Sequence, residues 1–404
     1  MLTTERYDQR SITLDDELNT VIDNVLDVPI DKAIGSFIDA ASGARDDTTR
    51  PSGFFITQRD FAKVKAFTQH VYKLPDTLEK VRKDLGYHQS SVPLLEPGNL
   101  LQLYKRAIGL ADFWIETEPL MKEVAAELAV FSVDLKTYGE AIISFIKSLS
   151  GYQNYFGEVG HVGADQLPDI KLNDQDRTSI PGLLGLSNEL LTIVQGYKRK
   201  ATHVKKRIEY FLEDLTELKD DISSASHALT NNNLGDKYAD QLKTLQRLSE
   251  EIEELRRTYE TYTKYKWVGA WWGPVGLIVS ASIYGPKAGT IRDQIDDALN
   301  KKEHLEGELK HLDNVSGSLA SFHTRLQLFE TLSLEAINGA KNIEDIWLLI
   351  NSYILASTSQ MEKNSSATKL LIFETRLSSM IKHWEQISDE AKKVFTPSEE
   401  HYVD

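Results

Sequence analysis

Apolar residues recur every three or four positions along most of this 404-residue chain, which is the spacing of amphipathic helices. The pattern is most regular in residues 186–265 and 288–360. Apolar positions there include Val204, Ile208, Phe211, Leu215 and Leu218, and then Leu305, Leu309, Leu312, Val315 and Leu319. Sustained heptads on both sides of a turn predict an antiparallel coiled-coil stalk, an ascending helix followed by a descending one. Each arm of about 75 residues would be ~110 Å long.

The remaining segments predict shorter helices at the end of this stalk. We expect residues 1–185 to form a tail bundle, with an exposed loop over 150–182, which is rich in Gly, Asp, Asn and Pro. Residues 361–404 contain a last amphipathic helix that would pack on the tail bundle. The predicted fold is therefore all-α: an elongated helical rod with a coiled-coil stalk, a multi-helix tail bundle and a short hydrophobic head.

The two arms are joined by an uncharged run from Trp267 to Pro286, inside an expected head of residues 266–287. Gly273, Pro274 and Gly276 lie in the middle of the run and favour a chain reversal over one spanning helix. Each half would then be ~15 Å long, which reaches about one leaflet deep in a bilayer. The residues expected to contact a membrane are Trp267, Val268, Trp271, Trp272, Val275, Leu277, Ile278, Val279, Ile283 and Tyr284.

Aromatic and basic side chains flank the run in the way that suits a lipid headgroup boundary: Lys264, Tyr265, Lys266 and Lys287. The competing interpretation is a buried core element, and a soluble form could cover the run by folding it back on its own arms. The expected position at the end of a rod, with little chain nearby, favours a membrane or a partner. Because the run has no polar stripe, it would anchor the protein and not line an aqueous pore.

The apolar helical pattern weakens about halfway along each arm. The first contains NNNLGD at 231–236 and the second NVSGS at 314–318, and these segments face each other if the chain turns near Val275. One interpretation is a tolerated irregularity, and the other is a hinge involving Asn232, Gly235 and Gly317.

Composition excludes several other functions. The formal net charge of −15 argues against nucleic acid as the main partner, and the absence of cysteine excludes disulfides and thiolate chemistry. The histidines show no metal-binding spacing, and the paired carboxylates of EEIEEL (250–255) are typical of exposed heptad positions. We therefore expect no enzyme activity, no metal and no cofactor. The N-terminal residues also lack the apolar stretch of a standard signal peptide.

The layout of two long helices around one hydrophobic head resembles that of the ClyA-type α-pore-forming toxins. The head run YKWVGAWWGPVGLIVSASIYGPKAG and the single-head arrangement are similar to the A component of the α-xenorhabdolysin-type binary cytotoxins. This resemblance implies a membrane-binding subunit that recruits and activates a second helical component. It also implies that the two components form a hetero-oligomeric ring that perforates eukaryotic membranes, with residues 267–284 as the membrane-contacting head.

The expected function is therefore that of a subunit of a bacterial two-component pore-forming cytotoxin. It would be soluble when released, without a standard signal peptide, and would act at the host cell membrane. The alternative is a non-toxic coiled-coil scaffold or adaptor whose hydrophobic tip docks into a partner protein.

Overall fold

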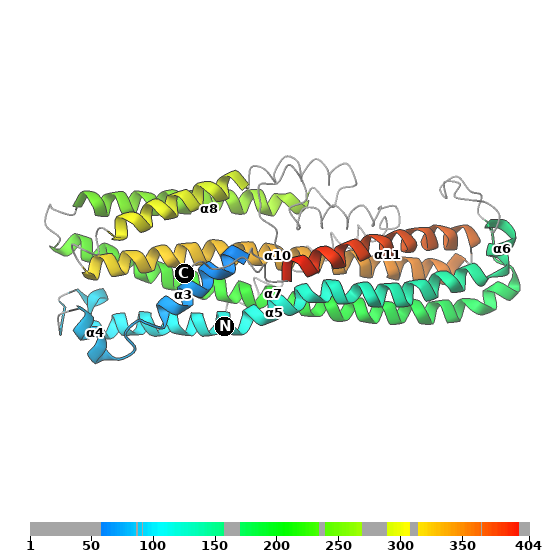
Figure 1. Ribbon diagram of the computed structural model, residues 1–404, viewed down its shortest axis with the longest axis horizontal. Helices are drawn as coiled ribbons and strands as arrows, with labels where there is room; N and C mark the ends of the chain where they lie inside the picture. The colour runs from blue at the N-terminus through cyan, green and yellow to red at the C-terminus, as the bar shows by residue number, and fades with distance from the viewer. Residues whose placement is uncertain are drawn as a thin grey trace.

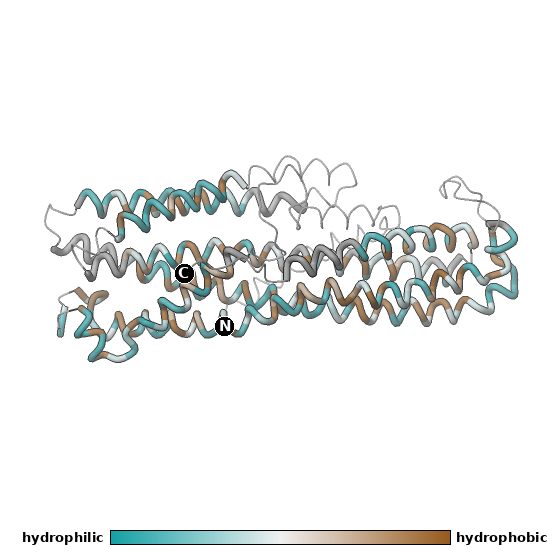
Figure 2. Tube along the Cα trace, in the orientation of Figure 1, coloured by the Kyte–Doolittle hydropathy of each residue, from teal (hydrophilic) through white to brown (hydrophobic). Residues whose placement is uncertain are grey.

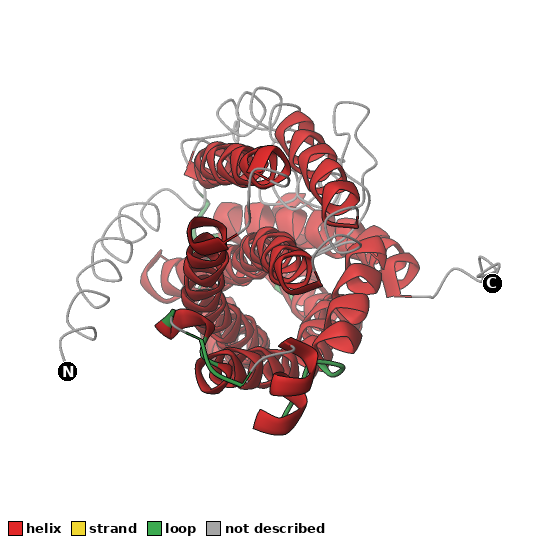
Figure 3. Ribbon diagram, turned by 90° about the vertical axis from the view of Figure 1, so that its left-hand side faces the viewer, coloured by secondary structure: helices red, strands yellow, loops and turns green. Residues whose placement is uncertain are grey.

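The described residues are helical apart from short connections, which confirms the all-α class. The structure is a computed structural model, and it describes residues 58–85, 88–90, 92–156, 170–233, 239–268, 289–307, 314–364 and 366–395. Within these ranges the one extended pairing is an isolated bridge between Lys171 and Ser366. The long helices run side by side along a common axis (Figure 1), and Figure 3 shows the same bundle nearly end on.

Ten helical elements account for the described chain. They are α3 (Gln58–Val71), α4 (Leu78–Leu85), the short 3-10 helix η2 (Pro93–Leu95), α5 (Pro97–Ser148), α6 (Ser150–Phe156), α7 (Asp174–Asn233), α8 (Ala239–Val268), a helical segment at 289–307, α10 (Asn314–Asn364) and α11 (Ala367–Phe395).

The main core lies between α5, α7, α10 and α11, whose apolar positions recur along each helix (Figure 2). Aromatic side chains fill its widest part. The Phe131 ring lies 4.9 Å from the rings of both Trp347 and Trp384, so that α5, α10 and α11 meet at one point. Full burial of side chains of this size contributes ~1.5–3 kcal/mol each. We call the elements that share this core the body.

The C-terminal helix α11 packs closely against α5. The indole Nε1 of Trp384 donates a hydrogen bond to the carbonyl oxygen of Leu128 at 2.8 Å. One turn away, Gly139 allows close approach, because a Cβ at this position would lie 2.6 Å from Cδ1 of Ile381. A small residue at this crossing therefore sets the distance between the two helices.

The loop expected over residues 150–182 is shorter than predicted, because α6 and the first turns of α7 lie within that range. The Asp176 carboxylate accepts hydrogen bonds from the backbone N–H groups of Ser150 (2.9 Å) and Gly151 (2.6 Å), and so caps α6. Asn173 Oδ1 in turn accepts from the backbone N–H of Asp176 at the start of α7. Composition suggested a loop because polar residues that cap helices are also the residues typical of loops.

The stalk also differs from the expected pair of uninterrupted arms. The first arm is divided into α7 and α8, and α8 runs back antiparallel along α7, since Lys219 contacts Glu253 at 2.8 Å. The segment 289–307 likewise runs antiparallel to α10, since Arg292 contacts Glu335 at 2.6 Å. The segments that lead into and out of the head therefore lie beside the middle of α10, and not beyond the end of the bundle (Figure 1).

The close approach at Gly139 predicts a position-specific effect of added side-chain volume. We expect Gly139→Val to lower the free energy of unfolding by ~1–3 kcal/mol, because its methyl groups would overlap Ile381. Gly109→Val is the matched control, since no atom outside its own helix lies within 4 Å of a Cβ there. Urea unfolding of the two variants measures the difference, and equal stability would show that the α5–α11 crossing is loosely packed.

Candidate functional site

The segments that flank the head form a unit of their own, which we call the folded-back arms: α8 and residues 289–307. A small apolar cluster holds the two arms to each other, and its buried members are Ile252, Tyr259, Ile291, Ile295, Ala298 and Leu299. Leu328 of α10 packs against this cluster from the body. None of the described residues of the arms belongs to the main core. The apolar packing of the arms is therefore largely internal to them.

Polar contacts connect the arms to the body. At their centre the Lys219 ammonium of α7 lies 2.8 Å from the carboxylates of both Glu253 (α8) and Glu330 (α10). Arg256 of α8 adds a second cation, 3.3 Å from Glu330. The side chain of Glu330 is only 1% exposed, so this group of charges joins three helices away from bulk water.

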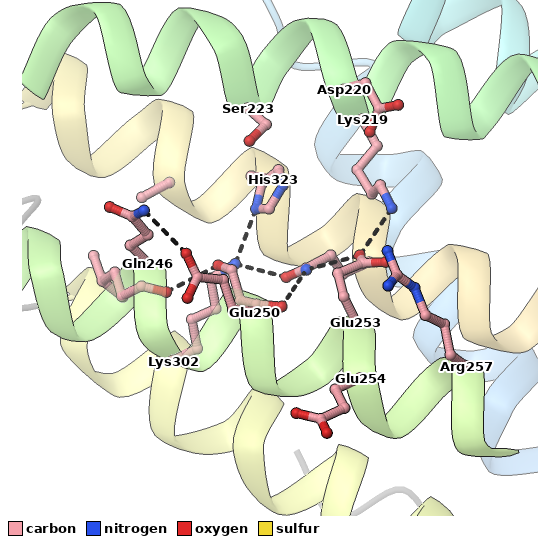
Figure 4. A pocket seen from close by; sticks show the side chains of 14 residues that line it. Lys219, Asp220, Ser223, Gln246, Glu250, Glu253, Glu254, Arg257, Lys302 and His323 are labelled. Atoms are coloured by element: carbon pink, nitrogen blue, oxygen red, sulfur yellow. Dashed lines mark hydrogen bonds and ion pairs between the residues drawn. The ribbon is translucent and has the colours of Figure 1, made fainter.

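A second buried group lies one to two turns further along the arms. Lys302 Nζ donates to Gln327 Oε1 at 2.7 Å and lies 3.0 Å from His323 Nδ1 (Figure 4). On the next turn the hydroxyl of Thr324 donates to the buried carboxylate of Glu306. These contacts attach the segment 289–307 to α10.

A third contact lies toward the head. Arg292 Nε is 2.6 Å from Glu335 Oε1, and the hydroxyl of Tyr259 donates to the same oxygen at 3.4 Å. The three groups together make up what we call the polar layer. Its charged members are four cations and four carboxylates: Lys219, Arg256, Arg292 and Lys302, with Glu253, Glu306, Glu330 and Glu335.

A cavity of about 630 Å³ lies beside the polar layer, between α7, α8, the segment 289–307 and α10. Figure 4 shows Lys219, Glu253, Lys302 and His323 around it. Most of its remaining lining is also polar: Asp220, Ser223, Gln246, Ser249, Glu250, Glu254, Arg257 and Gln327. A space lined in this way suits water and not an apolar ligand.

Burial raises the pKa values of the acids in the polar layer, whereas nearby cations lower them. Burial alone would raise the pKa of Glu253, but the hydrogen bond and charge of Lys219, together with Arg256, lower it to about 2. For Glu306 burial dominates and raises the pKa, although Lys302 and Thr324 partly offset it. Burial likewise lowers the pKa of Lys302, against the opposing charge of Glu306. Ionised Glu253 is therefore stabilised in place, whereas the charges of Lys302 and Glu306 are costly there.

Most of the predicted head lies outside the described residues. Lys264, Tyr265, Lys266, Trp267 and Val268 belong to the last turns of α8. The other predicted head residues lie outside the described ranges: Trp271, Trp272, Gly273, Pro274, Val275, Gly276, Leu277, Ile278, Val279, Ile283, Tyr284 and Lys287. Their contact with a membrane stays a prediction.

Two of the three proposed hinge residues are in described helices. Asn232 is in the last turn of α7 and Gly317 is in the first turn of α10, while Gly235 lies outside the described residues. The first chain reversal therefore falls at NNNLGD, whereas the second lies between residues 307 and 314, and NVSGS forms the first turn of α10. Whether these segments act as hinges stays a prediction.

Among the residues that the structure describes, no helix combines the length and apolar character needed to cross a bilayer. The same residues contain no group of His, Asp and Glu side chains placed to hold a metal ion.

The polar layer is not apparent from the sequence pattern. The heptad spacing predicts that the acidic residues of EEIEEL are exposed, yet Glu253 faces Lys219 and the cavity. A heptad pattern identifies one apolar stripe per helix, whereas α10 is buried on a second, polar stripe that includes His323, Gln327 and Glu330. A signal was present in the regular spacing of these polar residues beside Phe322, Leu326 and Phe329.

Comparison of the sequence with protein-family models and with curated proteins finds no match. Solved structures with a similar fold include XaxA from Xenorhabdus nematophila, with 19% identity over 84% of this chain and 96% of that chain and a TM-score of 0.45. The XaxAB pore complex from the same organism has 21% identity over 84% and 96%, with a TM-score of 0.44. SmhA of the tripartite α-pore-forming toxin Smh from Serratia marcescens has 11% identity over 89% and 92%, with a TM-score of 0.49. At these identities the similarity concerns the fold.

The lowered pKa of Glu253 predicts how attachment of the arms depends on pH. Because this pKa lies below the ordinary value of 4.5, ionised Glu253 stabilises the contact above pH 4.5, and the contribution is lost as the pH falls toward 2. At pH 6 we expect Glu253→Gln to weaken the attachment of α8 by ~1–3 kcal/mol, and the difference from the wild type to shrink as the pH falls below 4.5 and to vanish only below pH ~2.

Hydrogen exchange of the α8 amides, corrected for the intrinsic pH dependence of exchange, measures this difference. Glu251→Gln is the matched control, because this exposed acid on the same helix should leave exchange unchanged at every pH. Equal exchange of the wild type and Glu253→Gln at pH 6 would show that the contact between Lys219 and Glu253 does not hold α8.

Proposed function

We propose that this chain is the membrane-binding subunit of a two-component α-pore-forming toxin. The observation that carries the proposal is the connection of an uncharged, tryptophan-rich run, Trp267 to Pro286, to arms that double back along the body. An apolar segment between two arms that are held by polar contacts can be displaced without disrupting the main core. In this role the protein binds the target bilayer through residues 267–284.

The lengths of the helices determine how far the arms would move in this proposal. If the reversal between Asn233 and Ala239 straightened, residues 174–268 would form one helix of ~140 Å. The second reversal, between 307 and 314, would straighten with it, since the two arms share an apolar cluster. The ends of the two arms that flank the head would then move from the side of the bundle to beyond its end. Asn232, Gly235 and Gly317 are the proposed hinge residues.

The energetics of the head support an anchoring role. About nine large apolar side chains, at ~1.5–3 kcal/mol each, supply up to ~15–25 kcal/mol on insertion into lipid. Three tryptophans and the flanking lysines suit the headgroup boundary. Because the run has no polar stripe, a pore also requires a second, amphipathic component. A hetero-oligomer with a second helical chain meets that requirement, and it agrees with the XaxAB pore complex among the structures of similar fold.

In this proposal the protein carries no catalytic residues and no cofactor, because binding and rearrangement are sufficient for the activity. It is released from a bacterium and acts at the membrane of a target cell. The function of a scaffold whose tip docks into a partner protein differs in one respect, namely that such a protein should not bind pure lipid.

Membrane binding can be tested at the head. We expect the wild type to float with phosphatidylcholine vesicles in a density gradient, and Trp271→Glu with Trp272→Glu to abolish flotation, because two charges in the apolar run oppose insertion. The matched control is Val130→Glu with Val133→Glu on α5, whose side chains are already 54% and 66% exposed in the body. This control should float like the wild type.

Circular dichroism of the variants checks that both keep their helix content. Flotation that survives the tryptophan substitutions contradicts the assignment of the head. A wild type that ignores lipid and binds a protein partner through the same run supports the scaffold instead.

A further inference from the structure

We propose that the polar layer is a release element, which holds the folded-back arms by contacts whose loss on opening is largely compensated by water. The folded-back state would then lie close in free energy to the extended state, so that contact of the head with lipid is enough to shift the balance. This inference rests on the proposed function, because release is useful only if the arms open.

The two interfaces of the arms differ in chemistry. The interface between the arms is apolar and consists of Ile252, Ile295 and their neighbours, which favours movement of the two arms as one unit. The interface between the arms and the body contains the four cations and four carboxylates of the polar layer. An interface of the second kind separates more easily, because charged groups regain their hydration when they return to water.

The surroundings of Lys302 are the clearest indication that the polar layer does not give the arms the strongest possible attachment to the body. Lys302 is 1% exposed, and its hydrogen-bond contacts are the side chains of His323 and Gln327. Among the described residues no carboxylate lies within 4.0 Å of its ammonium group, while Glu306 acts on it from further away. A cation held in this way keeps a large part of its desolvation cost.

Buried charges predict opposite results for two kinds of substitution. Removal of one partner leaves an uncompensated charge and destabilises the contact strongly. Replacement of a whole group by apolar residues of similar size removes the desolvation cost and is often neutral or stabilising. If the polar layer serves release, the arms should therefore be attached to the body more strongly when one of its groups is replaced by apolar residues.

The test is hydrogen exchange of α8 and residues 289–307, without lipid, in variants of the full chain. The apolar variant combines Lys302→Met, Glu306→Leu, His323→Leu and Gln327→Leu, and we expect exchange in the arms to slow by about tenfold or more. The one-partner variant is Lys219→Met, which removes one of two cations that Glu253 and Glu330 share and leaves Arg256 between them. We expect it to speed exchange by about tenfold or more.

Two further variants control the comparison. Lys200→Met removes a cation that pairs with Glu123 and Glu127 between α7 and α5, and it should leave exchange in the arms unchanged. If thermal melting shows that the four-residue variant does not fold, the pair Lys302→Met with Glu306→Gln takes its place with the same expected direction. Unchanged or faster exchange of the arms in the apolar variant overturns the proposal, because the layer is then an ordinary stabilising contact.

Flotation of the same variants with phosphatidylcholine vesicles connects the layer to membrane binding. The apolar variant should float less than the wild type and Lys219→Met at least as well. Slower exchange with undiminished flotation also overturns the release role, because binding then does not require the arms to open. A wild type that does not float contradicts the proposed function itself, and the exchange result still decides whether the layer weakens the attachment of the arms.

Discussion

The ion pairs that Lys219 makes with Glu253 and Glu330 join α7, α8 and α10, and they hold α8 folded back against the body. With these contacts in place, α8 lies back along α7, and the segments that lead into and out of the head lie beside α10 near Glu335. Without them, little apolar contact connects the arms to the body, because the apolar cluster of the arms is mostly their own. In the proposed opening, this buried group of charges is therefore what the arms must give up to leave the body.

Two kinds of packing divide the molecule into parts with different tasks. The body is held by a continuous apolar core in which Phe131, Trp347 and Trp384 meet, and none of the described residues of the arms belongs to this core. The arms are held by charges, and the run between them carries no charge from Trp267 to Pro286. Water favours release of the arms and disfavours exposure of the head, whereas lipid accommodates the head. In the proposed function, a bilayer would therefore favour opening of the arms, because it accommodates the uncharged run.

The helical class and the long amphipathic segments could be predicted from the sequence. Heptad spacing revealed the helices, and NNNLGD marked the break between α7 and α8, although it predicted an irregularity or a hinge and not a reversal. The direction of the chain after each reversal could not be predicted, because α8 has the same apolar spacing whether it extends α7 or lies back along it. The role of Glu253 and Lys302 was hidden for a related reason: a charged residue looks exposed until a neighbouring helix covers it.

The most direct test of this account is a distance between α7 and α8 before and after membrane binding. The chain has no cysteine, so Asp214→Cys and Glu251→Cys place two spin labels at exposed positions for pulsed electron paramagnetic resonance. In water the labels should lie close together, because α8 is folded back along α7. On phosphatidylcholine vesicles the distance should increase to ~55 Å, the length of the intervening residues as one helix. A short distance that persists on the vesicles, or a long one already present in water, would contradict the account.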